Sequence, residues 1–124
     1  MIGYITIGTN DFEKSKSFYD AVLGELGGKR AMTNDHMQGW SNGQSPVMFA
    51  ICKPHDGKSA TFGNGTMISL AAPSKDAVGK VHAKAMSLGA KDEGAPGPRG
   101  DSGFYGAYFR DADGNKLCVF TMAR

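Results

Sequence analysis

The two halves of this 124-residue chain follow one pattern, and this internal repeat constrains the fold more than any other feature. Residues 4–7 (Tyr-Ile-Thr-Ile) align with residues 67–70 (Met-Ile-Ser-Leu), and Tyr19 then aligns with His82 inside a second matching segment. A repeat of this length predicts one supersecondary unit used twice. We therefore expect a single domain over 1–124, with module one at about 1–56, a linker at about 57–64 and module two at about 65–124.

Each half begins with a strand, continues with one helix and ends with further strands. The segments after each helix are too close together for crossover helices, so their strands should pair antiparallel. We predict an α+β fold of two βαβββ modules, with a curved, mostly antiparallel, cup-shaped sheet and helices on its outer face. The predicted strands are 2–8, 29–33, 36–41, 47–52, 66–71, 104–110 and 116–122, the predicted helices are 12–23 and 75–88, and the glycine-rich segment 94–103 is predicted to be a loop.

Alternation along the first strand of each module predicts which side chains line the cup. Successive strand residues point to opposite faces of a sheet. The apolar positions should face the helices, and these are Ile5, Ile7, Ile68 and Leu70. The alternate positions should face the cleft, and these are Tyr4, Thr6, Met67 and Ser69.

Composition excludes several classes of partner. The net charge is only +2 and no long basic run occurs, so nucleic acid is not an expected partner. No apolar stretch approaches the length of a membrane span, so no membrane partner is expected either. Two cysteines, Cys52 and Cys118, do not form a disulfide framework, which favours a reduced, cytoplasmic location.

Two motifs together resemble the vicinal-oxygen-chelate superfamily, which includes glyoxalases, bleomycin-resistance proteins and extradiol dioxygenases. Residues 4–8 (YITIG), followed by Asp11 and then residues 18–24 (FYDAVLG), are similar to the opening strand and helix of that family. Residues 108–115 (YFRDADGN) are similar to its closing F-x-D-P-x-G-N turn, and residues 63–66 (GNGT) are typical of a bacterial subgroup. The resemblance spans essentially the whole chain and implies paired βαβββ modules, a small-molecule site in the cup and a homodimer.

The resemblance also implies where a metal would be bound. Family enzymes hold one divalent metal through His, Gln or Glu and use it as a Lewis acid on vicinal oxygens of the substrate. The corresponding positions here are Tyr4, Met67, Cys118 and the segment 49–51. These side chains are not the nitrogen and oxygen donors that zinc or iron catalysis needs, so we expect no intact metal site and no cofactor.

Further side chains are candidates for contact with a ligand in the cup. Arg99 could pair with an anionic ligand or be a solvated loop charge. The aromatic candidates could stack on a flat ligand or pack in the core, and Cys118 could be a soft ligand or a small buried hydrophobe. The full predicted ligand-binding set is Tyr4, Thr6, His36, Trp40, Phe49, Met67, Ser69, Arg99, Tyr105, Tyr108 and Cys118, with Phe104 as a further aromatic candidate; no catalytic residue is assigned.

Three functions remain open at the level of sequence. The first is a metal-independent binder of an unidentified small molecule in an apolar, aromatic cleft, as in the bleomycin-resistance branch. The second is a lyase, isomerase or dioxygenase relative that uses a displaced metal site, with His36 involved, or metal-free acid–base chemistry by Tyr4. The third is a domain that serves only to form a dimer. The fold alone does not decide among them, because one fold can carry many reactions.

Overall fold

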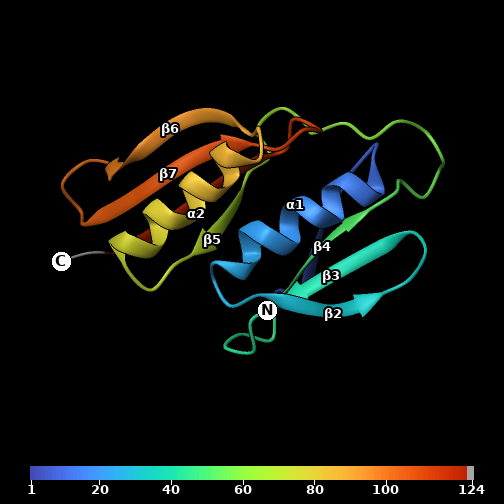
Figure 1. Cartoon of the computed structure of the whole chain (residues 1–124), viewed down its shortest axis with the longest axis horizontal. Helices are drawn as coiled ribbons and strands as arrows, with labels where there is room; N and C mark the ends of the chain where they lie inside the picture. The colour runs from blue at the N-terminus through green and yellow to red at the C-terminus, as the bar shows by residue number, and fades with distance from the viewer. Residues whose placement is uncertain (123–124) are drawn as a thin grey trace.

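The computed structural model describes residues 1–122 and contains two four-stranded sheets and two helices (Figure 1). Module one consists of β1 (Tyr4–Gly8), α1 (Phe12–Gly24), β2 (Lys29–Thr33), β3 (Met37–Ser41) and β4 (Met48–Cys52). Module two consists of β5 (Ile68–Ala71), α2 (Lys75–Ser87), β6 (Lys91–Pro98), β7 (Phe104–Arg110) and β8 (Lys116–Met122). This order confirms the predicted α+β class and the two βαβββ modules.

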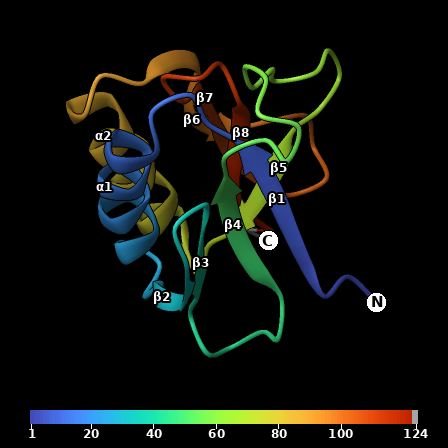
Figure 2. The ribbon, with the colours of Figure 1, turned by 90° about the vertical axis from the view of Figure 1, so that its right-hand side faces the viewer.

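Both sheets have the same strand order, which is β1-β4-β3-β2 in module one and β5-β8-β7-β6 in module two. The first strand of each module pairs parallel with the last strand, and all other pairs are antiparallel. Figure 2 shows α1 and α2 on one side of the strands, so the opposite side of the strand layer carries no helix. We call that opposite side the open face.

Local sequence sets where each helix begins. The Asp11 carboxylate accepts a hydrogen bond from the Lys14 N–H at 3.1 Å, and the Ser74 hydroxyl accepts one from the Ala77 N–H at 3.1 Å. Each cap satisfies an amide that has no partner inside its helix. Both helices therefore begin at a fixed residue next to the strand that precedes them.

The hydrophobic core lies between the helices and the strands. In module one, Tyr19 of α1 is fully buried, and its ring centroid lies 4.9 Å from that of Phe49 and 6.0 Å from that of Trp40. In module two, the apolar side of α2 packs on β7 and β8, where Phe109 and Leu117 are fully buried. Burial of each such side chain contributes about 1.5–3 kcal/mol, so both modules depend on this layer.

A buried carboxylate joins the two modules. Asp111, at the β7–β8 turn, accepts a hydrogen bond from the Tyr19 hydroxyl at 2.6 Å. The other Asp111 oxygen accepts from the backbone N–H groups of Asp113 and Asn115, each at 2.9 Å. The Asn115 side-chain amide donates to Asp111 at 3.0 Å and to the Gly8 carbonyl at 2.9 Å. This Tyr19–Asp111–Asn115 cluster therefore ties α1 and β1 of module one to the turn of module two.

The structure corrects one predicted element. The segment predicted as a loop from residue 94 contains most of β6, which pairs antiparallel with β7. The pairing is interrupted between Asp92 and Gly94 and again between Gly94 and Gly97. Such irregularities, together with the prolines at 96 and 98, remove the alternation by which a strand is recognised. No helix within residues 1–122 is long and apolar enough to cross a membrane.

Candidate functional site

The open face carries the first-strand side chains that alternation assigned to it. In module one, Tyr4 lies beside Met48 and Thr6 beside Ala50 in the parallel β1–β4 pair. Tyr4 and Thr6 are exposed, whereas Ile7 is buried on the helix side. The predicted orientation of this strand is therefore confirmed.

The same holds for module two, where Ser69 of β5 lies beside Cys118 of β8, and Cys118 lies beside Tyr108 of β7. Ser69 is exposed, and Met67, just before β5, is 42% exposed. Cys118 is fully buried among its neighbours on the central strand. A buried free thiol of this kind behaves as a small apolar group.

Large apolar side chains remain exposed at this face. Tyr4 is 60% exposed, and Met122, which pairs with Phe104, is 49% exposed. Phe104 and Phe120 stack on each other with ring centroids 5.2 Å apart and ring planes inclined by 3°. Exposed apolar groups that share one face are typical of surfaces that bind a ligand or a partner.

Tyr108 lies between two cations on the open face. The Arg99 guanidinium is 5.3 Å from the Tyr108 ring centroid, and the Lys116 ammonium is 5.6 Å from it. Partial burial raises the pKa of Tyr108, and the adjacent Cys118 thiol acts in the same direction. Arg99 also donates hydrogen bonds to the carbonyls of Ala95 at 2.7 Å and Gly97 at 2.9 Å. Arg99 therefore braces the C-terminal half of β6 while its charge stays beside Tyr108.

Three aromatic residues predicted to line the cleft lie on the other side of the sheets. Trp40 is 2% exposed and Phe49 is 7% exposed, and both pack against Tyr19. Tyr105 packs against the core of module two, with the Lys75 ammonium 5.3 Å from its ring centroid. The prediction that these three rings line the open face is wrong, because their strand positions alternate with those that point outward.

Trp40 and Phe49 do border a small hollow on the helix side. It measures about 240 Å³ and lies between the end of α1, the β3–β4 connection and β5. The Trp40 indole N–H donates a hydrogen bond to Asp20 at 2.9 Å, so the ring is held in place by its own module. These contacts support core packing, the alternative left open for both rings.

His36 does not lie on a strand of the open face. It is exposed in the turn that precedes β3, and its Nδ1 is 3.2 Å from the Asp35 carboxylate. The prediction that His36 shares a cleft strand with Trp40 is therefore wrong. The turn after β2 ends one residue later than the apolar pattern indicated.

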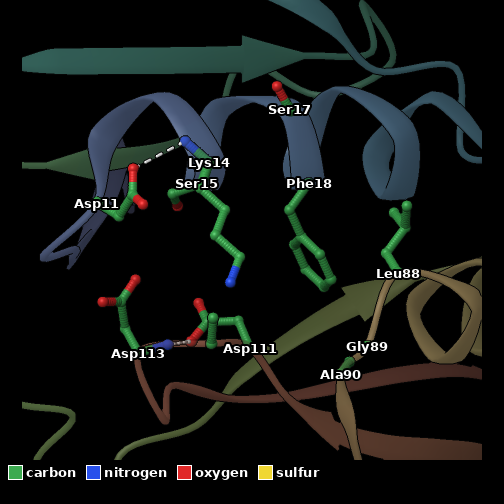
Figure 3. Close-up of a pocket in the computed structure, with 11 residues that line it drawn as sticks. Asp11, Lys14, Ser15, Ser17, Phe18, Leu88, Gly89, Ala90, Asp111 and Asp113 are labelled. Carbon is green, nitrogen blue, oxygen red and sulfur yellow. Dashed lines mark hydrogen bonds between the residues drawn. The ribbon is translucent and has the colours of Figure 1, made fainter.

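A larger hollow lies where the sequence predicted no site. It measures about 430 Å³ and lies between α1, the end of α2 and the β7–β8 turn (Figure 3). The two halves of its wall are far apart in the sequence, and the turn residues Asp111 and Asp113 are sufficiently explained by the turn itself. No spacing in the sequence therefore pointed to this hollow.

Comparison with known proteins identifies the family. The family model described as the Glyoxalase/Bleomycin resistance protein/Dioxygenase superfamily matches residues 1–119. The chain belongs to this superfamily. A glyoxalase/bleomycin resistance protein from Albidiferax ferrireducens T118 is 37% identical, with a TM-score of 0.89 and 98% of each chain covered.

Solved structures with lower sequence identity share the fold. A fosfomycin resistance protein from Mesorhizobium loti is 16% identical, with a TM-score of 0.71 and coverage of 98% of this chain and 91% of that chain. A lactoylglutathione lyase from Agrobacterium tumefaciens is 18% identical, with a TM-score of 0.73 and coverage of 98% and 92%. A search of curated proteins found no match.

The positions that the family resemblance assigned to metal ligands do not carry the usual His, Gln or Glu side chains. Tyr4, Met67 and Cys118 offer a phenol, a thioether and a buried thiol. The β4 segment at the remaining position is Phe49-Ala50-Ile51, which has no donor side chain. Within residues 1–122, no three His, Cys, Asp or Glu side chains are grouped so as to hold a metal. The donor set of this chain therefore differs from the nitrogen and oxygen ligands that zinc or iron catalysis requires.

Proposed function

We propose that this superfamily member binds an apolar or aromatic small molecule at the open face and does so without a family metal. The observation that carries the proposal is the exposure of Tyr4 and Met67, two positions that the family resemblance assigned to metal ligands. An aromatic ring and a thioether are suited to contact with an apolar ligand, because both offer large, polarisable surfaces.

The rest of the open face supports the same chemistry. The stacked pair Phe104 and Phe120 adds further aromatic surface to this face. Arg99 and Lys116 border this apolar area beside Tyr108 and offer an anchor for a polar substituent. Ligand sites commonly combine an apolar lining with a few convergent polar groups of this kind.

We also propose that the protein is a cytoplasmic homodimer. Apolar side chains of the open face are left exposed by residues 1–122, and a second copy would shield part of them while the ligand lies between the two copies. Both cysteines are free thiols, which is consistent with a reducing compartment.

The proposal is tested by metal content together with ligand binding. Tag-free protein is equilibrated with Ni²⁺, Zn²⁺, Mn²⁺ and Fe²⁺, desalted and analysed for metal per chain. A flat aromatic probe, 2-naphthol, is then titrated, and backbone ¹⁵N chemical shifts locate where it binds. We expect no metal to be retained and the largest shifts in β1, β5, β7 and β8.

Variants separate the open face from other apolar surfaces. Tyr4→Ser and Met67→Ser should each weaken binding of the probe by about fivefold or more, because each removes on the order of 1 kcal/mol of apolar contact. Val47→Ser is the matched control, because Val47 is also exposed but belongs to the hollow on the helix side. Retention of about one metal per chain would contradict the proposal and favour a metalloenzyme with a displaced site.

A further inference from the structure

The hollow between the modules is a walled cavity. Five residues at the beginning of α1 form one wall, residues 88–90 after α2 form the second, and the turn 111–113 forms the third; the five are Asp11, Lys14, Ser15, Ser17 and Phe18. In Figure 3, α1 runs along one side and the turn along the other, with side chains from both pointing into the space between them. Its volume of about 430 Å³ is within the range of small-molecule pockets.

The cavity holds charges of both signs that do not pair with each other. The Lys14 side chain extends from α1 into the space, towards the turn that carries Asp111 and Asp113 (Figure 3). Five lysines on or near α1 and α2 form ion pairs or lie over aromatic rings, whereas Lys14 forms no ion pair within residues 1–122. Its ammonium therefore faces the cavity without a carboxylate partner.

The two outer carboxylates are each used through one oxygen only. Asp113 accepts a hydrogen bond from the Asn10 N–H through Oδ1 at 2.8 Å, and Asp11 accepts from the Lys14 N–H through Oδ1 at 3.1 Å. Within residues 1–122, the second oxygen of each carboxylate makes no hydrogen bond. Asp111 differs, because all its hydrogen bonds are made inside the protein, and it forms the floor.

A serine hydroxyl on α1 also faces the cavity. Ser15 is only 8% exposed and lines the hollow. Its hydroxyl makes no hydrogen bond to a residue within 1–122, and Figure 3 shows it on the cavity side of α1. Within residues 1–122 no fully buried side-chain oxygen or nitrogen lacks a hydrogen-bond partner, so the Ser15 hydroxyl oxygen is reached from the cavity. The Ser15 hydroxyl is therefore available to a ligand.

The rest of the wall is apolar. The Phe18 ring points from α1 into the space, and Leu88, which is 45% exposed, stands opposite it at the end of α2 (Figure 3). Ala90 completes this side. A ligand that fills the cavity would thus meet polar groups at one end and an apolar surface at the other.

We infer that this cavity binds a small zwitterion with an apolar side group, such as a free α-amino acid. The ammonium of such a ligand is complementary to the free oxygens of Asp113 and Asp11. Its carboxylate is complementary to the Lys14 ammonium and the Ser15 hydroxyl, and its side group fits between Phe18 and Leu88. A ligand with only one sign of charge would leave the opposite group of the cavity unpaired.

The test compares three probes that share a phenyl group. L-phenylalanine carries both charges, 2-phenylethylamine lacks the carboxylate, and 3-phenylpropanoate lacks the ammonium. Each is titrated into ¹⁵N-labelled protein, and backbone shifts at 11–18, 88–90 and 111–113 are followed. We expect L-phenylalanine to shift these residues and to bind about fivefold or more tightly than either analogue, as one surface ion pair allows.

Three variants assign the contacts. Lys14→Met and Asp113→Asn should each weaken binding of L-phenylalanine by about fivefold, and the Asn side chain still accepts from the Asn10 N–H, which protects the turn. Ser15→Leu should abolish binding by filling the space. Lys16→Met is the matched control, because Lys16 lies on the same helix outside the cavity, and its loss should leave binding unchanged.

Two results would overturn the inference. The first is equal or tighter binding of 2-phenylethylamine or 3-phenylpropanoate, which would mean that only one charge is recognised. The second is the absence of shifts in these three segments at millimolar L-phenylalanine. Binding of 2-naphthol at the open face is followed through the chemical shifts of other residues. A negative result with L-phenylalanine therefore does not contradict the proposed function of the open face.

Discussion

Replacing Tyr19 by Phe tests the buried cluster that joins the modules. The change removes one hydroxyl and keeps the ring, so the aromatic packing against Phe49 is retained. Asp111 loses the 2.6 Å hydrogen bond but keeps its three remaining donors. A hydrogen bond to a charged group contributes about 1.5–3 kcal/mol. Because Asp111 is only 8% exposed and water cannot readily replace the phenol, we expect a loss of about 2–3 kcal/mol.

Urea unfolding measures this loss, and the single tryptophan, buried beside Tyr19, provides the fluorescence signal. Tyr105→Phe is the matched control. Its hydroxyl makes no hydrogen bond within residues 1–122, so its removal should change the free energy of unfolding by less than about 0.5 kcal/mol. Equal effects of the two substitutions would refute the assigned role of the hydroxyl.

The same substitution has a predicted pH dependence. Burial, followed by the charge of Asp111, raises the pKa of Tyr19 well above its ordinary value of 10.0. Above pH 10 the unfolded chain releases the phenolic proton of Tyr19, whereas the folded chain keeps it until the pH reaches the raised pKa. Stability is therefore fully present below pH 10 and is lost as the pH rises, by up to about 1.4 kcal/mol per pH unit. Tyr19→Phe should lack this alkaline loss, and parallel pH profiles of the two proteins would contradict the reasoning.

Three further predictions concern stability, each measured by urea unfolding. Gly114→Ala should destabilise the protein by more than about 1 kcal/mol. Gly114 has φ +85°, and an added Cβ would lie 2.7 Å from the Phe62 ring. Gly79→Ala, at a helical position with open space, should instead stabilise it by about 0.8–1 kcal/mol, and a loss of stability would contradict the open space beside Gly79. Asp20→Asn should lower the free energy of unfolding at pH 7 by roughly a few tenths of a kcal/mol, because the ion pair with Arg30 is exposed. The hydrogen bond from Arg30 lowers the pKa of Asp20, so its contribution is present above the ordinary value of 3.8 and should vanish as the pH falls below it.

The fold was predictable because the strongest signals were local. The repeat fixed the number of modules, and β1 and β5 alternate clearly enough to place Tyr4 and Ser69 on the open face. The segments 37–41 and 48–52 lack this alternation, since one contains Gly39 and the other is continuously apolar. Their inward and outward positions follow only from the register between β3 and β4, which no single strand encodes.

The cavity and the buried cluster were not predictable for a different reason. Tyr19 and Asp111 are separated by 92 positions in the sequence, and each has a sufficient local explanation as a helix-core residue and a turn residue. Ser15 looks like an ordinary helical serine until the turn of module two is placed opposite it. Contacts between modules depend on how two completed units pack, and periodicity within either unit carries no information about that packing.

The contact between Tyr19 and Asp111 also makes the two repeats unequal. The position that aligns with Tyr19 in the second repeat is His82, and its Nε2 lies 3.1 Å from Asp92 of the same module. In the first repeat this helix position contacts the other module, whereas in the second repeat it contacts a residue of its own module. A chain assembled from two copies of the second repeat would fold each half with a complete helix and sheet, but it would have no phenol to fasten one half to the other.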